Sequence, residues 1–206
     1  MGANSKVFDR LRFDSYKLHF IEWIIPKKNE RIQNYAKRMA KDIDASKPVI
    51  LVGMSFGGIM VQEISKFINA EKIILISTVK TKYELPTLYK ISSALNLHKL
   101  IPSIFFHNTK LIAKTLFGRS THSIIKTLEE YFTMRDIRYS RWAIDKVVNW
   151  KQTKFHKNIL HLHGTKDYVF PAKYIHNATF VKGCTHLMIF TNANELNKHI
   201  SNFLEN

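Results

Sequence analysis

Hydrophobic positions along the chain fall into two patterns, short continuous runs and stripes at helical spacing. The runs Val49–Val52 and Ile73–Ile76 contain only apolar residues, which is typical of strands buried on both faces of a parallel sheet. Apolar-rich segments at Leu18–Ile25, Ile159–His163 and Ala178–Val181 predict three further strands.

Helical stripes lie between and after these strands. Apolar residues recur every three or four positions over residues 30–43, behind the potential cap Asn29. The same spacing returns from Met60 to Ile68 and over residues 196–204. Strands that alternate with helices through short connections predict an α/β fold, in which helices flank a mostly parallel sheet.

Residues 80–150 break this alternation. Their apolar positions keep helical spacing, Pro86 and Pro102 interrupt the helices, and no strand of any length is apparent. A block of helices inserted between two strands predicts a cap or lid over the strand ends. We therefore expect a core made of residues 1–79 and 151–206, with a helical cap at 80–150.

A serine lies where a strand is expected to turn into a helix. Gly53-Met54-Ser55-Phe56-Gly57 follows the run that ends at Val52, and an amphipathic stripe follows it. Such a sharp turn exposes the serine hydroxyl and favours small residues two positions before and after it, as Gly53 and Gly57 are. The amides at the start of the helix also point towards whatever the serine attacks. The pattern and its context indicate a nucleophile.

An acid and a base follow two later strands. Asp167 comes shortly after the strand at Ile159–His163, and His186 comes shortly after the strand at Ala178–Val181. Because parallel strands end at one edge of a sheet, both side chains are expected near Ser55. His186 would take the Ser55 proton and return it to the leaving group, while Asp167 holds the imidazole and stabilises its charged form. The order Ser55, Asp167, His186 is that of nucleophile-elbow enzymes.

At these motifs the chain resembles the α/β-hydrolase superfamily, in particular small bacterial serine hydrolases with a helical cap. GMSFGG, HGTKDYVFP and GCTHLMIF are similar to its nucleophile, acid and base motifs, and MGANSKVF is similar to the loop after its oxyanion strand. The resemblance implies hydrolysis of a carboxylic ester, thioester or related acyl bond through an acyl-enzyme. It also implies that the backbone amides of Phe56 and Met1 stabilise the oxyanion.

The chain departs from that resemblance at its start. The strand before the oxyanion loop is absent, although in the superfamily it lies between the strands that match Leu18–Ile25 and Val49–Val52. Its loss would leave backbone groups unpaired. We therefore expect a shortened form of a longer, active enzyme. Two other functions stay open: an acyltransferase with the same triad, and a non-catalytic binding protein of the same fold.

Charge and composition narrow the partners. The net charge of +16 is spread as +5, +7 and +4 over residues 1–79, 80–150 and 151–206, without a basic run or tail. We expect a small-molecule acyl substrate, for which the charge of the cap favours an anionic donor, and no nucleic acid. No uncharged apolar run of membrane-spanning length and no secretory signal are present, so we expect no stable membrane insertion.

Cofactors and metals are not expected. The chain has no Gly-x-Gly-x-x-Gly fingerprint, and its single cysteine, Cys184, suits a reducing cytoplasm and is interpreted as a small buried filler. His161 and His163 alternate along one strand and so face the same way, but no acid or cysteine with ligand spacing accompanies them. Packing in the core or at the rim is the favoured interpretation of this pair. The oligomeric state is not predicted.

Overall fold

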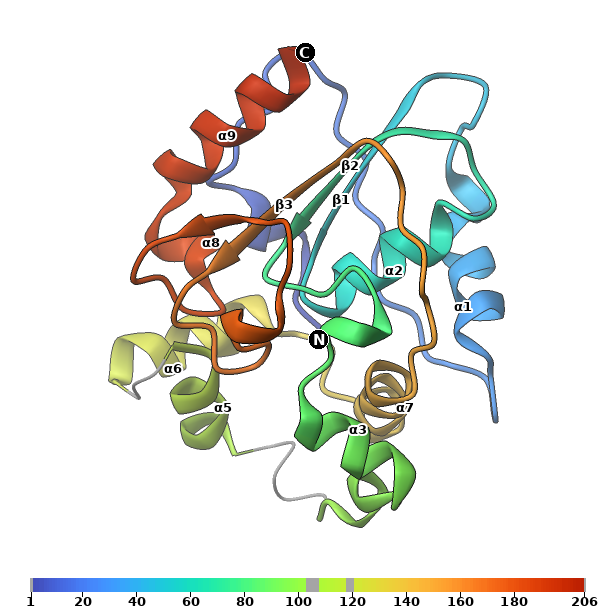
Figure 1. Ribbon diagram of the computed structural model, residues 1–206, viewed down its shortest axis with the longest axis vertical. Coiled ribbons are helices and arrows are strands. Elements are labelled where there is room, and N and C mark those ends of the chain that lie inside the picture. The colour runs from blue at the N-terminus through green and yellow to red at the C-terminus, as the bar shows by residue number, and fades with distance from the viewer. Residues whose placement is uncertain (1, 103–107, 118–120, 206) are drawn as a thin grey trace.

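A four-stranded parallel sheet forms the centre of the molecule (Figure 1). The computed structural model describes residues 2–102, 108–117 and 121–205. The strands are β1 (Val49–Met54), β2 (Ala70–Ile76), β3 (Ile159–Gly164) and β4 (Thr179–Val181), and they lie side by side in this order. Four of the five predicted strands are therefore confirmed, and their carboxyl ends share one edge.

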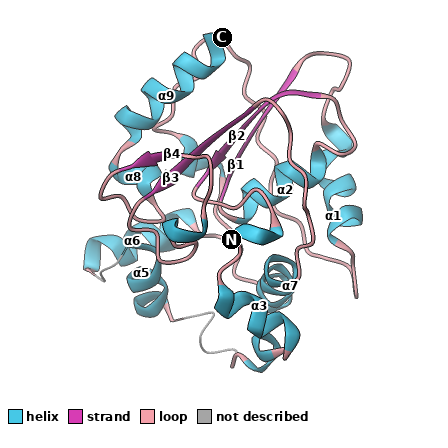
Figure 2. Cartoon of the chain, in the orientation of Figure 1, coloured by secondary structure: helices cyan, strands magenta, loops and turns pink. Residues whose placement is uncertain are grey.

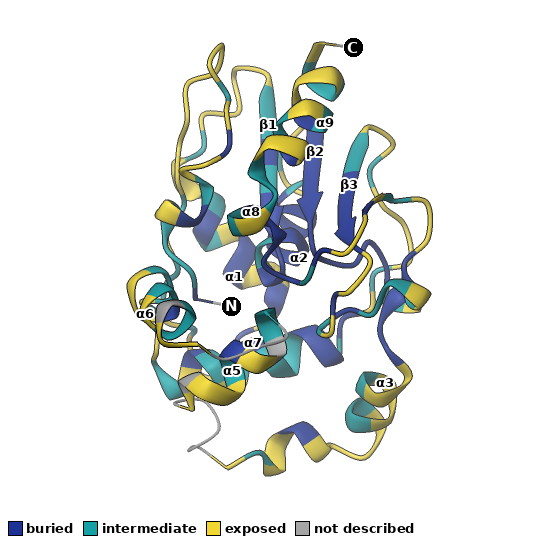
Figure 3. Ribbon diagram, turned by 90° about the vertical axis from the view of Figure 1, so that its left-hand side faces the viewer, coloured by how far each residue is buried: buried dark blue, intermediate teal, exposed yellow. Residues whose placement is uncertain are grey.

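Helices cover both faces of the sheet (Figure 2). On one face lie α1 (Ile32–Met39) and α2 (Phe56–Ile64), and on the other lie α8 (Met188–Thr191) and α9 (Ala193–Glu205). The remaining α-helices follow β2 and precede β3, and they are α3 (Thr87–Ala94), α5 (Thr109–Phe117), α6 (His122–Tyr131) and α7 (Ile137–Val148). These four gather beyond the carboxyl ends of the strands (Figure 3). The division of the chain into core and cap at residues 80 and 150 stays a prediction.

The two faces of the sheet bury separate apolar clusters. Ile73 and Leu75 of β2 pack with α1 and α2, whereas Ile74 and Ile76 pack on the opposite side with α8 and α9. All four side chains are fully buried. The run therefore lacks apolar–polar alternation because both of its faces lie inside the molecule.

The segment Leu18–Ile25 is not a strand, so this prediction is wrong. It carries no regular secondary structure, and Leu18 and Phe20 remain 50% and 45% exposed. Its apolar, β-favouring composition is not sufficient, because a strand also needs a partner for its backbone. Asn29 does not cap the next helix either. It has a left-handed backbone with φ 56°, and α1 begins two residues beyond the start expected from the apolar stripe.

Within the described residues, β1 is an edge strand with β2 as its neighbour. The amide of Ser55 donates to the carbonyl oxygen of Ile76 in β2. Because alternate residues of a strand point their backbone groups to opposite sides, those of Ile50 and Val52 face away from β2.

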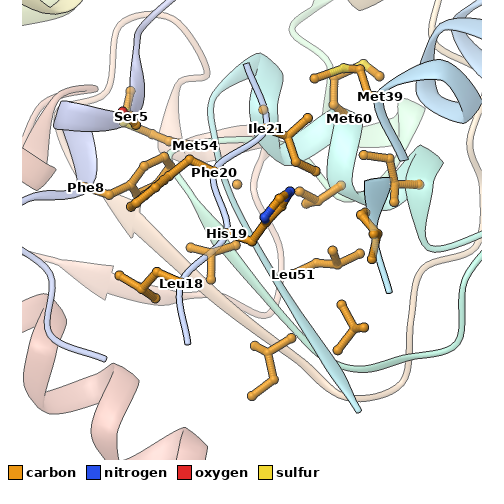
Figure 4. Close-up of a pocket in the computed structure, with 18 of the residues that line it drawn as sticks. Ser5, Phe8, Leu18, His19, Phe20, Ile21, Met39, Leu51, Met54 and Met60 are labelled. Atoms are coloured by element: carbon orange, nitrogen blue, oxygen red, sulfur yellow. The ribbon is translucent and has the colours of Figure 1, made fainter. Parts of the chain in front are cut away.

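A cavity of about 550 Å³ lies along this outer edge of β1 (Figure 4). Its lining includes Leu18 and Phe20 from the non-strand segment, Leu51 and Met54 from β1, and Met60 from α2. Unpaired backbone groups are expected at this place, because the strand that would precede the oxyanion loop is absent from the sequence. The expectation of a longer active form stays a prediction.

Candidate active site

Ser55 occupies a sharp turn between β1 and α2. Its backbone angles are φ 54° and ψ −123°, a conformation that costs a non-glycine residue on the order of 1–3 kcal/mol. The turn brings Gly53 against Gly57, so that a Cβ on Gly53 would lie only 2.4 Å from the Gly57 carbonyl oxygen. Gly53 is thus required by this close approach of backbone to backbone, as the sequence pattern predicts.

Gly57 is not required in the same way. A Cβ built on it would meet only Trp23, at 4.0 Å, which is ordinary contact. The position that needs a second glycine is Gly58, whose Cβ would lie 2.4 Å from the methyl group of Thr78. Position 57 can therefore hold a Cβ, and the steric requirement for glycine falls one residue later, at Gly58.

Thr78, just after β2, supports the turn from the neighbouring strand. Its hydroxyl donates a hydrogen bond of 2.7 Å to the carbonyl oxygen of Ser55, and it is fully buried. No sequence pattern marks this residue, because a threonine after a strand carries no signal of its own. Its position beside a serine elbow becomes evident only when β1 and β2 are paired.

The imidazole of His186 lies between the two other predicted residues. Its Nε2 is 2.9 Å from the Ser55 hydroxyl oxygen, and its Nδ1 is 2.8 Å from Oδ2 of Asp167. The three side chains are buried, with residue exposures of 7%, 3% and 1% for Ser55, Asp167 and His186. The structure thus brings together residues separated by more than 100 positions, in the geometry that general-base activation of a hydroxyl requires.

Asp167 is held by its own loop as well as by His186. Its Oδ1 accepts hydrogen bonds from the amides of Val169 and Phe170, at 2.8 and 2.9 Å. Burial alone would raise the pKa of this carboxyl, but attraction to His186 and the hydrogen bonds outweigh burial and lower the pKa below its ordinary value. Asp167 is therefore ionised at neutral pH and able to stabilise an imidazolium.

A second cavity, of about 460 Å³, opens onto the hydroxyl of Ser55 and the ring of His186. Although smaller than the cavity beside β1, it is the one that contains Ser55, Phe56 and His186 together. Its described walls come largely from apolar residues of the predicted cap and the acid loop, among them Leu88, Leu97, Ile101, Ile144, Val148 and Phe170.

Two polar side chains in this wall, those of Tyr89 and His98, already have partners within the protein. The Tyr89 hydroxyl donates to the Val169 carbonyl, and both ring nitrogens of His98 have partners, the Ser92 carbonyl and Asp145. Among the described lining residues there is no Lys, Arg, Asp or Glu. From the charge of the cap, an anionic acyl donor is expected. The lining gives this expectation no support, because the Lys and Arg residues of the cap are not among the described residues that line the cavity.

One of the two predicted oxyanion donors can be placed. Phe56 is the first residue of α2, so its amide has no acceptor within the helix, and it lines the same cavity as Ser55 and His186. Met1, the other predicted donor, lies outside the described residues. Its role stays a prediction.

The remaining chemical candidates, Cys184, His161 and His163, are all buried. Cys184 is buried, and burial raises the pKa of its thiol, which suits a filler rather than a nucleophile. His161 and His163 are buried, and the described residues contain no group of three or more potential metal ligands. In the same part of the chain, no helix has the length and apolar character to cross a bilayer.

Comparison with known proteins shows that the fold of this chain is shared with solved structures. The sequence matches no profile of a protein family and no curated protein. A hydrolase from Oleispira antarctica superimposes with a TM-score of 0.67 at 13% identity, covering 100% of this chain and 88% of the other. An esterase from Thermogutta terrifontis gives 0.60 at 14% identity, covering 89% and 75%. A bromoperoxidase from Bacillus anthracis gives 0.54 at 19% identity, covering 84% and 73%.

At identities this low, these superpositions show a shared fold and say nothing of a shared activity. The parallel sheet and the helices on both of its faces agree with that shared architecture. The chain has the α/β-hydrolase fold.

Proposed function

We propose that the protein is a serine hydrolase that cleaves a carboxylic ester, thioester or related acyl bond through an acyl-enzyme. The observation that carries the proposal is the continuous hydrogen-bonded arrangement from Ser55 through His186 to Asp167 at the floor of a cavity. A binding protein that had lost catalysis would have no need of a strained serine aligned with a buried base and acid.

The proposed reaction starts when Nε2 of His186 accepts the hydroxyl proton of Ser55 as its oxygen attacks the acyl carbonyl. The amide of Phe56 donates to the developing oxyanion, and the imidazolium faces the ionised Asp167. His186 then gives its proton to the leaving alcohol or thiol, and the acyl group stays on Ser55. A water molecule, deprotonated by His186, releases the acid and restores the serine.

The cavity supports an uncharged, apolar acyl group. Its described lining is mainly aliphatic and aromatic, and the hydrogen bonds of Tyr89 and His98 are satisfied within the protein. A charged acyl chain would lose its hydration without gaining a Lys, Arg, Asp or Glu partner among the described lining residues. We therefore propose aliphatic or aryl carboxylic esters as substrates in place of the anionic donors considered from the charge of the chain.

Labelling with a fluorophosphonate tests the nucleophile. The wild-type protein is expected to form a covalent adduct at Ser55, and Ser55→Ala is expected to form none. Ser201→Ala, an exposed serine on α9, is the matched control and should label like wild type. An adduct that persists in Ser55→Ala would reject the proposal, as would the absence of labelling in folded wild-type protein, which instead favours the binding protein.

Hydrolysis of p-nitrophenyl butyrate, with and without added alcohol, then separates the two enzymatic functions. Release of the free acid as the main product supports hydrolysis. Preferential formation of a new ester at low alcohol concentration would assign the chain as an acyltransferase with the same triad.

A further inference from the structure

We infer that His161 and His163 are positioning residues, one for the nucleophile and one for the acid of the proposed triad. The inference rests on the proposed function. Both histidines lie on β3 and neither belongs to the triad, and the sequence alone favours packing as their role. Their contacts differ: those of His161 lead to Ser55, and those of His163 lead to Asp167.

His161 acts on the nucleophile side. Its Nε2 lies 3.1 Å from the carbonyl oxygen of Thr78, so this nitrogen donates the hydrogen bond. The hydroxyl of the same threonine donates to the carbonyl oxygen of Ser55 at 2.7 Å. His161 therefore fixes the backbone of the residue that supports the strained serine.

His163 acts on the acid side. Its Nε2 donates to the carbonyl oxygen of Phe170 at 2.8 Å, while the amide of Phe170 donates to Asp167. The same nitrogen lies 3.6 Å from Oδ2 of Asp167, the oxygen that receives the bond from His186. Both backbone groups of Phe170 are therefore held, its carbonyl by His163 and its amide by Asp167. The ring of Phe170 also packs against His186.

The rings of His161 and His163 have the same burial and the same pattern of hydrogen bonds. Each is buried, each uses Nε2 to bind a backbone carbonyl, and each leaves Nδ1 without a partner. A donor at Nε2 and an unpaired acceptor at Nδ1 define a single neutral tautomer. Burial lowers the pKa of both histidines, to about 3 for His161.

The charged and titratable groups around the pair are few. His161 is influenced by His163 and Lys80, and His163 by Asp167 and His186. A core with no use for these hydrogen bonds could be filled by leucine without leaving Nδ1 of either ring buried and unpaired. Retaining two such rings is explained by the carbonyl groups that they hold.

Different defects follow from the two roles. His161→Leu should loosen the serine turn, which lowers the rate of fluorophosphonate labelling about tenfold and leaves its pH profile in place. His163→Leu should loosen Asp167, so that the imidazolium of His186 is less stabilised. The acid limb of the labelling profile then moves to lower pH, together with a loss of rate of about tenfold or more.

Each histidine is the matched control for the other, and glutamine is the conservative variant of both. The glutamine amide nitrogen can occupy the place of Nε2, so His161→Gln and His163→Gln should recover most of the lost rate, and the asparagine variants should not. This comparison serves equally if the leucine variants fail to fold. The NMR proton signal of His186 Nδ1–H gives a readout without substrate, and it should change in His163→Leu and persist in His161→Leu.

Two results would overturn the inference: folded leucine variants with wild-type rates and profiles, or leucine and glutamine variants with equal defects, which indicate packing alone. Failure of the proposed function itself has another signature. In that case labelling would not depend on Ser55 at all, whatever residues stand at positions 161 and 163.

Discussion

The hydroxyl of Thr78 donates a 2.7 Å hydrogen bond to the carbonyl oxygen of Ser55, which links β2 to the turn that carries the proposed nucleophile. Ser55 holds an unfavourable backbone conformation, so the turn depends on contacts from outside it. The amide of Gly58 also donates to this carbonyl, at 3.0 Å, and Thr78 supplies the contact from the neighbouring strand.

Replacing Thr78 by valine should therefore lower catalysis without unfolding the protein. Valine keeps the shape and removes the hydrogen bond, whose net value of about 1 kcal/mol corresponds to a rate loss of roughly fivefold. The loss should appear in kcat with p-nitrophenyl butyrate, with KM little changed. Thr78→Ser retains the hydroxyl and should stay close to wild type. Equal activity of the valine and serine variants would contradict the role given to this bond.

Gly53 and Gly57 should respond in opposite ways to alanine. A Cβ on Gly53 would collide with the backbone of Gly57, whereas a Cβ on Gly57 finds normal contact. Gly53→Ala should reduce the free energy of unfolding by about 2 kcal/mol or more and abolish labelling at Ser55. Gly57→Ala, in the first turn of α2, should be neutral or stabilise by up to about 1 kcal/mol. Urea unfolding of both variants measures this difference, and similar losses in both would be inconsistent with the ordinary contact at Gly57.

Stability should depend on pH through His161. Its pKa is lowered from 6.5 to about 3, so below pH 6.5 the unfolded chain binds a proton that the folded chain does not. The free energy of unfolding therefore falls as pH falls, by up to about 1.4 kcal/mol per pH unit from this residue. Urea titrations at pH 6.0 and 4.5 should show a smaller fall in His161→Gln than in wild type. An identical fall in the two proteins would show that His161 is not neutral in the fold.

Narrowing the cavity should discriminate between acyl chains. Ile144 of α7 lines the cavity above Ser55, so Ile144→Trp should reduce kcat/KM for p-nitrophenyl octanoate more than for the acetate, by about tenfold. Arg138→Trp changes an exposed position on the same helix and controls for the added indole. A uniform loss over all chain lengths would place the acyl group elsewhere.

Sequence patterns predict the triad because its placement follows from topology. Ser55, Asp167 and His186 each follow a parallel strand, and parallel strands end together, so three separate motifs specify one place. The roles of Thr78 and His163 could not be found in this way. Thr78 acts on a backbone carbonyl, as does His163, and a carbonyl group is the same at every position of the chain. Only the folded chain shows which carbonyl each side chain reaches.

The wrong prediction at Leu18–Ile25 has a related cause. Composition reports that a segment can form a strand, but strand formation depends on a neighbour at the correct distance and register. The described chain gives β1 a neighbour on one side only, β2, and the Leu18–Ile25 segment lies across the cavity from the other side.

Because β1 has a partner strand on one side only within the described chain, its backbone amides should exchange with solvent at two different rates. Those of Leu51 and Gly53 point towards β2 and are held in the ladder, whereas those of Ile50 and Val52 point towards the cavity. Deuterium uptake along this single strand should therefore alternate from one residue to the next, with the two outward positions exchanging first. Any molecule or chain segment that pairs with this edge would be detected as slowed exchange at Ile50 and Val52 alone.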